Sequence, residues 1–392
     1  MLLKWTVLFL CWHSVCGLEM NHLSYYETLS HIHLSSRVTR SSQSQVDVVK
    51  RVQFNAFQRN FHLTLRPGAQ VLPKDFKARL VHKNGSSSVL PVDQSNIFTG
   101  HDTYNVNSTV HAHLEEDIWS IQIIEESEIY VVEPAWRILE PFNNPHNDTM
   151  VAYRMSDLKG LSDGYKFCNV LGKHSKRNPS LSHQAPQPDR LQSQLLTLLS
   201  NGGKRVRRQK RNHGREICQI YVVGDTDLFR KRCRSNHFAC LSLMIQHVRF
   251  ADKVFKLSQF EDILGNSVVG FGIQIAELLL LEDYSKPDYI SDVRHFNEDY
   301  HKWSADSKLN SFGTYMALSR KKYCLNHLFT EFADPKGVLG LAYVNQLCQW
   351  RNQDFFFNSG ITSGTNKLGL KLPSLAISLV ITHEVGEFSW ML

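Results

Sequence analysis

The residues best suited to chemistry lie in the segment Ile381–Glu387, which follows an apolar run and reads ITHEVGE. In a helix, the pattern His-Glu-x-x-His places two imidazoles on one face to hold zinc, and its glutamate takes a proton from a metal-bound water. His383 and Glu384 match the first half of this pattern, whereas Glu387 stands where the second histidine would be. A His-Glu pair also occurs often by chance, so the remaining sequence has to decide what this pair does.

The segment Met1–Gly17 has the features of a secretory signal peptide. Lys4 precedes an apolar core, and the small residues that end the segment suit signal peptidase. The segment is too short for a stable membrane anchor, and no later stretch holds the roughly eighteen uninterrupted apolar residues of a membrane helix. We therefore expect a protein of the secretory pathway, secreted as written and a single-pass membrane protein if a longer form exists.

The cysteines and the glycosylation sequons agree with that compartment. In an oxidising lumen, the default state of each cysteine outside the signal peptide is a disulfide. These cysteines are Cys168, Cys218, Cys233, Cys240, Cys324 and Cys348. Three Asn-x-Ser/Thr sequons begin at Asn84, Asn107 and Asn147, and they predict glycans on a separate N-terminal module.

A basic run lies between two compositionally different halves of the chain. Seven Lys and Arg residues within residues 204–215 equal the whole formal net charge of +7, so the footprint of a nucleic-acid-binding protein is missing elsewhere. The run lies in a linker rich in Ser, Gln and Pro and matches a furin-like convertase site twice; the alternative is a solvated basic run or a nuclear signal. The basic side chains of the predicted site are Arg205, Arg207, Arg208, Lys210 and Arg211.

The predicted secondary structure that must position these residues differs between the first and the second half of the chain. Residues 18–50 show no periodic apolar face, and we expect them to be irregular. Short alternating runs up to about residue 137 predict an antiparallel β module. The same composition also suits a β domain without chemistry. We expect the strands to end near residue 150. After the basic run, strands alternate with helices, which predicts a mostly parallel sheet with helices on its faces.

The expected strands and helices can be given by residue numbers. The strands are 61–65, 97–100, 118–124, 129–132, 218–223, 268–281, 324–332 and 338–344. The helices are 237–255, 311–322 and a last one that begins at Pro373 and Ser374 and carries His383.

An ordered series of sequence blocks resembles the ADAM family of metalloproteases. The blocks are FNAFQRNF (54–61), FTGH (98–101), YVVEPAWR (130–137), GIQI (272–275), HLFT (327–330), GVLGLAYV (337–344), NSGITS (358–363) and ITHEVG (381–386). They follow the family's order, and the series rather than any single block is specific. Within the family, the blocks are most similar to the branch of the tumour-necrosis-factor-α-converting enzyme, with the Kuzbanian branch next.

The resemblance implies a fold class, a domain order and an activity. The fold class is α+β and multi-domain, with a β-rich prodomain followed by an incomplete α/β metalloprotease domain of the metzincin type. The implied segments are a signal peptide (1–17), a prodomain (18–176), a linker with the processing site (177–211) and the N-terminal part of the metalloprotease domain (212–392). The implied activity is that of a zinc-dependent endopeptidase that sheds the ectodomains of membrane proteins, including cytokine precursors and Notch-like receptors.

The resemblance also gives roles to single residues and names partners. His383 corresponds to the first zinc ligand and Glu384 to the general base. Cys168 lies where the family's prodomain carries its switch cysteine, whose thiolate fills the open position on zinc and keeps the zymogen inactive. The implied partners are the chain's own prodomain, a furin-like convertase and membrane-protein ectodomain substrates.

A disulfide is implied in the same way. Cys218 and Cys324 correspond to a pair that joins the family's first protease strand to a later one. Cys233 and Cys240 then remain as candidates for a local pair, and the pairing of Cys348 stays open.

Two features depart from the family pattern. Residues 345–357 are shorter and more aromatic than the Gly-rich segment beside the family's substrate cleft, and Glu387 replaces a histidine. With one sure ligand, we expect weak zinc binding and no peptidase activity of this polypeptide. We interpret the sequence as a truncated product of a sheddase gene, in which Leu375, Leu379 and Phe388 would be exposed. The alternatives are a secreted non-catalytic decoy or inhibitor of the full-length protease, and an unrelated structural glycoprotein.

Overall fold

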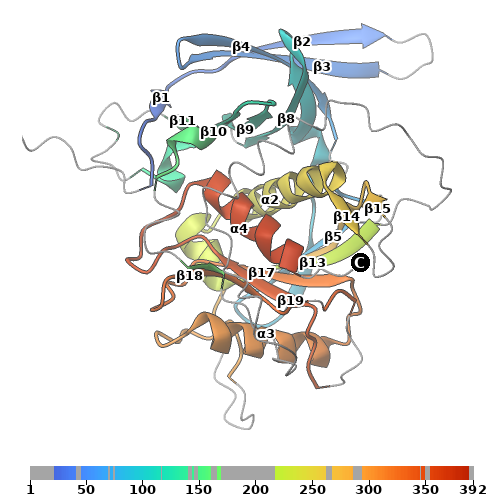
Figure 1. Ribbon diagram of the computed structural model, residues 1–392, viewed down its shortest axis with the longest axis vertical. Helices are drawn as coiled ribbons and strands as arrows, with labels where there is room; N and C mark the ends of the chain where they lie inside the picture. The colour runs from blue at the N-terminus through green and yellow to red at the C-terminus, as the bar shows by residue number, and fades with distance from the viewer. Residues whose placement is uncertain are drawn as a thin grey trace, which may run out of the picture.

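The computed structural model of the chain contains two large β-sheets with helices between and beside them (Figure 1). It describes residues 22–40, 46–68, 71–73, 76–115, 117–139, 144, 149–159, 166–168, 217–261, 267–285, 294–344, 346–348 and 354–387. The signal peptide, the convertase site, Asn147 and Phe388 lie outside these residues, so what is expected of them stays a prediction.

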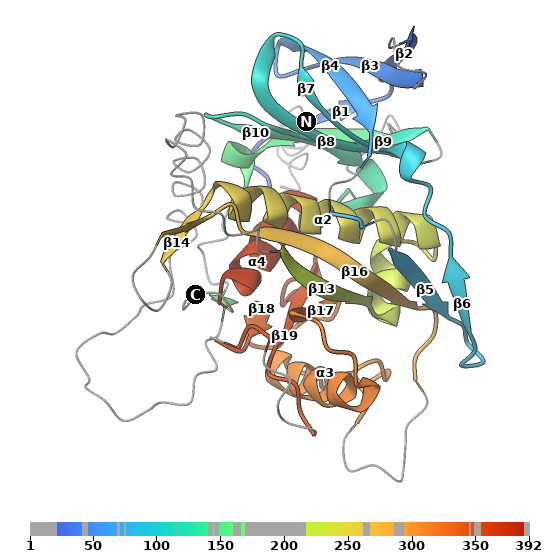
Figure 2. The ribbon, with the colours of Figure 1, turned by 90° about the vertical axis from the view of Figure 1, so that its right-hand side faces the viewer.

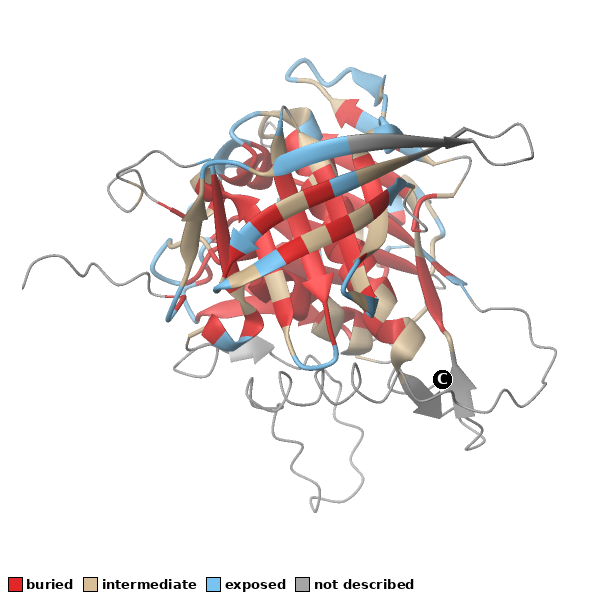
Figure 3. Ribbon diagram, turned by 90° about the horizontal axis from the view of Figure 1, so that it is seen from above, coloured by how far each residue is buried: buried red, intermediate tan, exposed pale blue. Residues whose placement is uncertain are grey.

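The first sheet, called here the N-terminal sheet, has nine strands that are antiparallel to their neighbours, in the order β1-β11-β10-β9-β8-β7-β4-β3-β2. The strands are β1 (Glu27–Leu29), β2 (His33–Arg40), β3 (Val46–Ala56), β4 (Arg59–Pro67), β7 (Ile97–Asp102), β8 (Asn105–Glu115), β9 (Ile118–Ile124), β10 (Ile129–Pro134) and β11 (Met150–Arg154). Buried side chains alternate along β4, at Phe61, Leu63 and Leu65, as the pleat of a strand requires. Figure 3, which is coloured by burial, shows strands on which buried positions alternate with less buried ones. The predicted antiparallel β region is therefore present.

The expectation of irregular structure before residue 50 is wrong for the described residues. Strand β2 pairs with β3 from His33, opposite Gln53, to Arg40, opposite Val46. Because β2 is the edge of its sheet and begins with exposed side chains, it needs no apolar face, and its polar sequence conceals it. Strands also continue past residue 150, in β11 and in β12 (Lys166–Cys168).

The second sheet, called here the mixed sheet, has eight strands in the order β12-β18-β19-β17-β13-β16-β5-β6. Besides β12 it contains β5 (Lys77–Val81), β6 (Ser87–Leu90), β13 (Ile217–Gly224), β16 (Gly272–Leu281), β17 (Leu325–Thr330), β18 (Val338–Ala342) and β19 (Ser359–Ser363). The five central strands are parallel and β18 is antiparallel to β19, so the predicted, mostly parallel sheet is confirmed. The single strand predicted over 268–281 is divided at Gly270, whose φ is 78°, into β15 (Ser267–Val269), which pairs with β14 (Gln259–Glu261), and β16.

Three strands of the mixed sheet come from residues before 170. β5 pairs with β16, so that Leu80 lies opposite Leu280, and β12 pairs with β18 at the other end of the sheet. The two halves of the sequence therefore share one sheet. The sequence pattern identifies a strand but does not show which sheet a short strand joins.

The described α-helices are α2 (His237–Leu257), α3 (Ala305–Ser319) and α4 (Ser374–Glu387). Short helical turns are η1 (Gln94–Asn96), η2 (Ala135–Arg137), η4 (Met155–Asp157) and η5 (Leu228–Arg232). Helices α2 and α4 lie side by side between the two sheets, and α3 covers the other face of the mixed sheet (Figures 1 and 2). Helix α3 begins six residues before the predicted helix, because Ser304 Oγ accepts a hydrogen bond from the backbone N of Ser307 at 3.2 Å.

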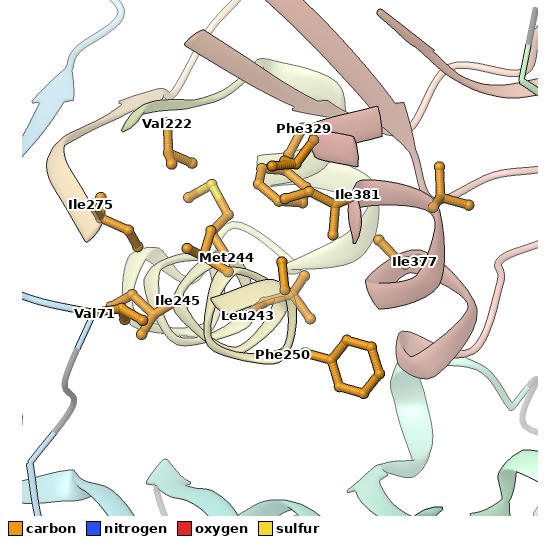
Figure 4. Close-up of a cluster of buried hydrophobic side chains, with 14 of the residues drawn as sticks. Val71, Val222, Leu243, Met244, Ile245, Phe250, Ile275, Phe329, Ile377 and Ile381 are labelled. Carbon is orange, nitrogen blue, oxygen red and sulfur yellow. The ribbon is translucent and has the colours of Figure 1, made fainter. Parts of the chain in front are cut away.

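A large apolar cluster forms where α2 and α4 meet the mixed sheet. Figure 4 shows Met244 and Phe250 of α2 close to Ile377 and Ile381 of α4. Leu375 and Leu379 are only 0% and 5% exposed, so the expectation that they would be exposed is wrong. The reason is that α4 packs against α2 and against strands β18 and β19 of the mixed sheet.

Candidate active site

The last turns of helix α4 carry His383 and Glu384. Glu384 is fully buried, and His383 is partly exposed. Burial lowers the pKa of the His383 imidazole to about 4. The ring is therefore neutral at pH 7, which is the protonation state in which an imidazole can bind a metal.

Gly340 of strand β18 packs directly on the Glu384 carboxylate. A Cβ atom on Gly340 would lie 2.6 Å from Cγ1 of Val380 and closer still to Oε1 of Glu384. A side chain at this position would have to displace the side chains of Glu384 and Val380, so the glycine allows α4 to pack closely on the sheet. Gly340 belongs to the block GVLGLAYV, but its contact with Glu384 is apparent only from the structure.

Strand β12 brings the backbone of Cys168 to the same place. It runs parallel to β18, with Lys166 opposite Val338 and Cys168 opposite Gly340. Cys168, Gly340 and Glu384 thus follow one another from β12 to β18 to α4. The side chains of Cys168 and Glu387 are outside the described part of the chain.

The other end of α4 is held by the N-terminal sheet. Both oxygens of the buried Glu133 carboxylate, on β10, accept hydrogen bonds from Ser374: Oε1 from its backbone N at 3.0 Å, and Oε2 from its hydroxyl. Tyr153 of β11 donates to Glu133 Oε1 at 2.7 Å and accepts from the backbone N of Leu375 at 3.1 Å. A carboxylate at a helix N-terminus satisfies free N–H groups and complements the helix dipole. Sequence reasoning did not find Glu133, although it belongs to the block YVVEPAWR.

A buried polar contact also joins α2, α4 and the N-terminal sheet. Ser378 Oγ of α4 lies 2.8 Å from Nδ1 of His247 on α2. The same hydroxyl accepts a long hydrogen bond, 3.5 Å, from Nε2 of Gln122 on β9. One turn further along α4, Thr382 donates to the carbonyl of Ser378 at 2.6 Å. The helix that carries His383 is therefore fixed by both halves of the chain.

The described residues do not complete a zinc site. They contain no group of three or more His, Cys, Asp or Glu side chains that could hold a metal ion. A catalytic zinc takes three protein ligands and a water. A complete ligand set for such a zinc is therefore not found among the described residues.

The described residues contain two disulfides. Cys218, in the first strand of the mixed sheet after the linker, is bonded to Cys324, which directly precedes β17, as the resemblance implied. Cys233 and Cys240 form the local pair that the sequence left open. Cys348 is exposed and has a free thiol.

The aromatic segment that departs from the family pattern packs against α3. The rings of Phe355 and Phe357 lie 5.5 and 5.3 Å from that of Tyr343, and Phe355 fills the space beside Gly313 of α3. Phe355, Phe356 and Phe357 therefore belong to a second apolar cluster, on the α3 side of the mixed sheet.

The two sequons within the described residues are accessible. Asn84 lies in the β5–β6 turn and Asn107 on β8, and both are exposed. Asn84 Oδ1 accepts a hydrogen bond from the backbone N of Ser86 at 3.0 Å. Glycosylation of either residue stays a prediction.

Comparisons with known proteins agree with this arrangement. The family described as metallo-peptidase family M12B, reprolysin-like, matches residues 280–388, which include β17, β18, β19 and α4. Human disintegrin and metalloproteinase domain-containing protein 10 is 24% identical over 98% of this chain and 52% of its own length. The chain is thus similar to ADAM metalloproteases over nearly its whole length. The Xenopus laevis protein of the same name is 24% identical over 93% of the chain and 48% of its own length, and the Caenorhabditis elegans homologue 22% identical over 96% and 45%.

These relatives correct one detail of the resemblance and set its limits. They carry the name of protein 10, whereas the sequence blocks had put the branch of the tumour-necrosis-factor-α-converting enzyme first. The chain spans about half the length of these relatives. No helix in its described part is long and apolar enough to cross a membrane.

Proposed function

We propose that this chain is the zymogen portion of a zinc-dependent ADAM endopeptidase that sheds the ectodomains of membrane proteins such as cytokine precursors and Notch-like receptors. In this proposal His383 is a zinc ligand, Glu384 is the general base and Cys168 is the switch cysteine. A furin-like convertase separates the two halves within residues 205–211. We further propose that the polypeptide as written retains little zinc and has no peptidase activity, because Glu387 stands at a histidine position.

The pairing of Cys168 with Gly340, directly above Glu384, supports this proposal best. An extended peptide can bind a sheet by pairing with its edge strand. Strand β12 occupies that edge of β18, so a substrate could not pair there while β12 remains. The same strand brings the proposed switch cysteine to the level of the proposed general base. Both effects would keep the uncleaved chain inactive.

The residues on and around α4 have different roles in the proposed site. The His383 ring is neutral at pH 7 and available as a ligand, and the buried Glu384 carboxylate would accept a proton from water. Gly340 fixes the position of that carboxylate, and Glu133 fixes the other end of the helix.

Zinc retention and peptidase activity test this function together. The full chain is treated with a furin-like convertase, dialysed against metal-free buffer, and assayed for bound zinc and for cleavage of a shedding-site peptide. We expect well under one zinc per chain and no cleavage. Chelator-sensitive cleavage by the unaltered chain would refute the proposed inactivity.

A restored ligand shows whether α4 is a metal-binding helix. Glu387→His creates the complete His-Glu-x-x-His spacing, and we expect it to raise zinc retention by at least about tenfold, while the control Glu387→Gln does not. Adding His383→Ala to Glu387→His should abolish the gain. Equal zinc retention in the Glu387→His and Glu387→Gln chains would count against His383 as a ligand.

A further inference from the structure

A pocket of about 300 Å³ lies between the N-terminal sheet and helix α2, and no residue of α4 lines it. Strands β7 and β8 form one wall, with Thr99 and His111, and the second half of α2 forms the other. Figure 2 shows α2 directly below this sheet. The pocket is therefore complete only while the two halves of the chain are docked.

The α2 wall carries more positive than negative charge. Arg249 is 3% exposed and donates from Nη2 to the backbone oxygen of Phe98 and to Thr99 Oγ1, both at 2.7 Å. Lys256 pairs with Asp252 at 2.7 Å. Among the described residues, no carboxylate forms an ion pair with Arg249 or with Lys253. The three cations thus face one carboxylate, which leaves two positive charges without a counterion.

The single carboxylate, that of Asp252, already accepts a hydrogen bond at each of its two oxygens. Asp252 Oδ2 accepts from Lys256, and its Oδ1 accepts from the backbone N of Ile273 at 2.9 Å. Burial is the main reason that the pKa of Arg249 falls to about 9 and that the pKa of Lys253 is lowered. A buried cation without a counterion is costly, and a bound anion would remove that cost.

His111 adds a polar atom to the opposite wall. Its ring is buried, and Nδ1 has no hydrogen-bond partner among the described residues. Burial, and then the charges of Arg249, Lys253 and Lys256, hold the His111 pKa well below 6.5. The ring is therefore neutral at pH 7 and has a nitrogen that could donate to an oxyanion.

We propose that this pocket binds a sulfate or phosphate group, either as a free inorganic anion or as the sulfate of a glycosaminoglycan chain. Its volume is at the small end of ligand pockets, which suits a charged group with at most one or two sugar rings. Because the walls come from both halves of the chain, the anion stabilises their docked arrangement through binding linkage. The bound anion would slow the separation of the halves after cleavage of the linker; binding itself does not depend on the proposed peptidase activity.

The test measures thermal unfolding of the intact chain at pH 7 with added sodium sulfate, sodium phosphate or a heparin-derived sulfated disaccharide. Sodium chloride of the same ionic strength serves as the reference. We expect a saturable rise in Tm of about 3 °C or more at concentrations well above Kd. A rise with inorganic ions indicates a free anion, and a rise with the disaccharide alone indicates a glycosaminoglycan. No rise above the chloride reference with any of the three would overturn the proposal.

Two lysine variants separate the pocket from general surface charge. Lys253→Gln removes an unpaired cation of the pocket and should weaken binding by about tenfold. Lys302→Gln removes the same charge from an exposed residue outside the pocket and should leave the response unchanged. The same Tm response in both variants would show that the effect is non-specific.

Discussion

The two ends of helix α4 are held by different parts of the chain. At its C-terminal end, Glu384 packs on Gly340 of the mixed sheet, 44 residues earlier in the sequence. At its N-terminal end, Ser374 is bound by Glu133 of the N-terminal sheet, 241 residues earlier. The first contact lies within the region that matches the M12B family, and the second crosses the linker that is proposed to be cleaved. The helix that carries the candidate site therefore depends on both halves of the uncleaved chain.

The contact at the C-terminal end is steric and should be the more sensitive one. We expect Gly340→Ala to lower the free energy of unfolding by about 3 kcal/mol, because the added methyl group overlaps Glu384 and Val380. Denaturant unfolding of the intact chain measures this. Gly386→Ala is the control in the same helix: its nearest neighbour is Phe255 Cζ at 4.0 Å, so it should be neutral or slightly stabilising. Equal losses in the two variants would show that Gly340 has no special role.

The contact at the N-terminal end is polar and should be somewhat weaker. Glu133→Ala removes the acceptor of three hydrogen bonds, from the backbone and hydroxyl of Ser374 and from Tyr153, and we expect a loss of about 2 kcal/mol. Glu126→Ala removes an exposed carboxylate beside the same sheet and should change the unfolding free energy by less than about 0.5 kcal/mol.

A double-mutant cycle shows whether the loss at Glu133 acts through helix α4. If it does, Glu133→Ala and Ser374→Ala should together cost clearly less than the sum of their separate effects. Additive losses would mean that Glu133 stabilises its own sheet alone. In that case the helix would be held mainly by the mixed sheet.

The difference between the two ends also explains what the sequence could predict. His383, Glu384 and the helix start at Ser374 follow from local patterns, as do strand β9 and the start of α2 at His237. Their signals lie within a few residues: alternation, helical spacing or a short motif. Such signals do not depend on where the rest of the chain lies.

Features that depend on distant partners could not be predicted. Glu133 is an ordinary glutamate in the sequence until its sheet is placed against α4. Strands β5 and β12 are short, and nothing local shows that they extend a sheet formed after residue 216. Strand β2 has a polar sequence because it lies at an edge. Each of these features is determined by packing rather than by local pattern.

The interface between the N-terminal sheet and helices α2 and α4 should lose stability at acidic pH. His113 of β8 is 3% exposed, and burial, followed by the charges of Arg137, Arg249 and His247, holds its pKa well below 6.5. At pH 6 and below, the unfolded chain binds a proton at this histidine and the folded chain does not. Stability is therefore complete above pH 6.5 and falls as the pH decreases, by up to about 1.4 kcal/mol per pH unit for this one residue.

Unfolding free energies at pH 7.5, 6.5 and 5.5 test this sign with matched variants. His113→Gln removes the titrating ring, so the loss of stability between pH 6.5 and 5.5 should be smaller than in the unaltered chain. His301 is exposed, and His301→Gln should keep the full pH dependence. Other buried histidines at this interface, His111 and His247, have pKa values lowered for the same main reason, burial. If the unfolding free energies of His113→Gln and His301→Gln change equally with pH, the interface is not the origin of the acid sensitivity. The N-terminal end of α4 would then be no more sensitive to pH than the end that packs on Gly340.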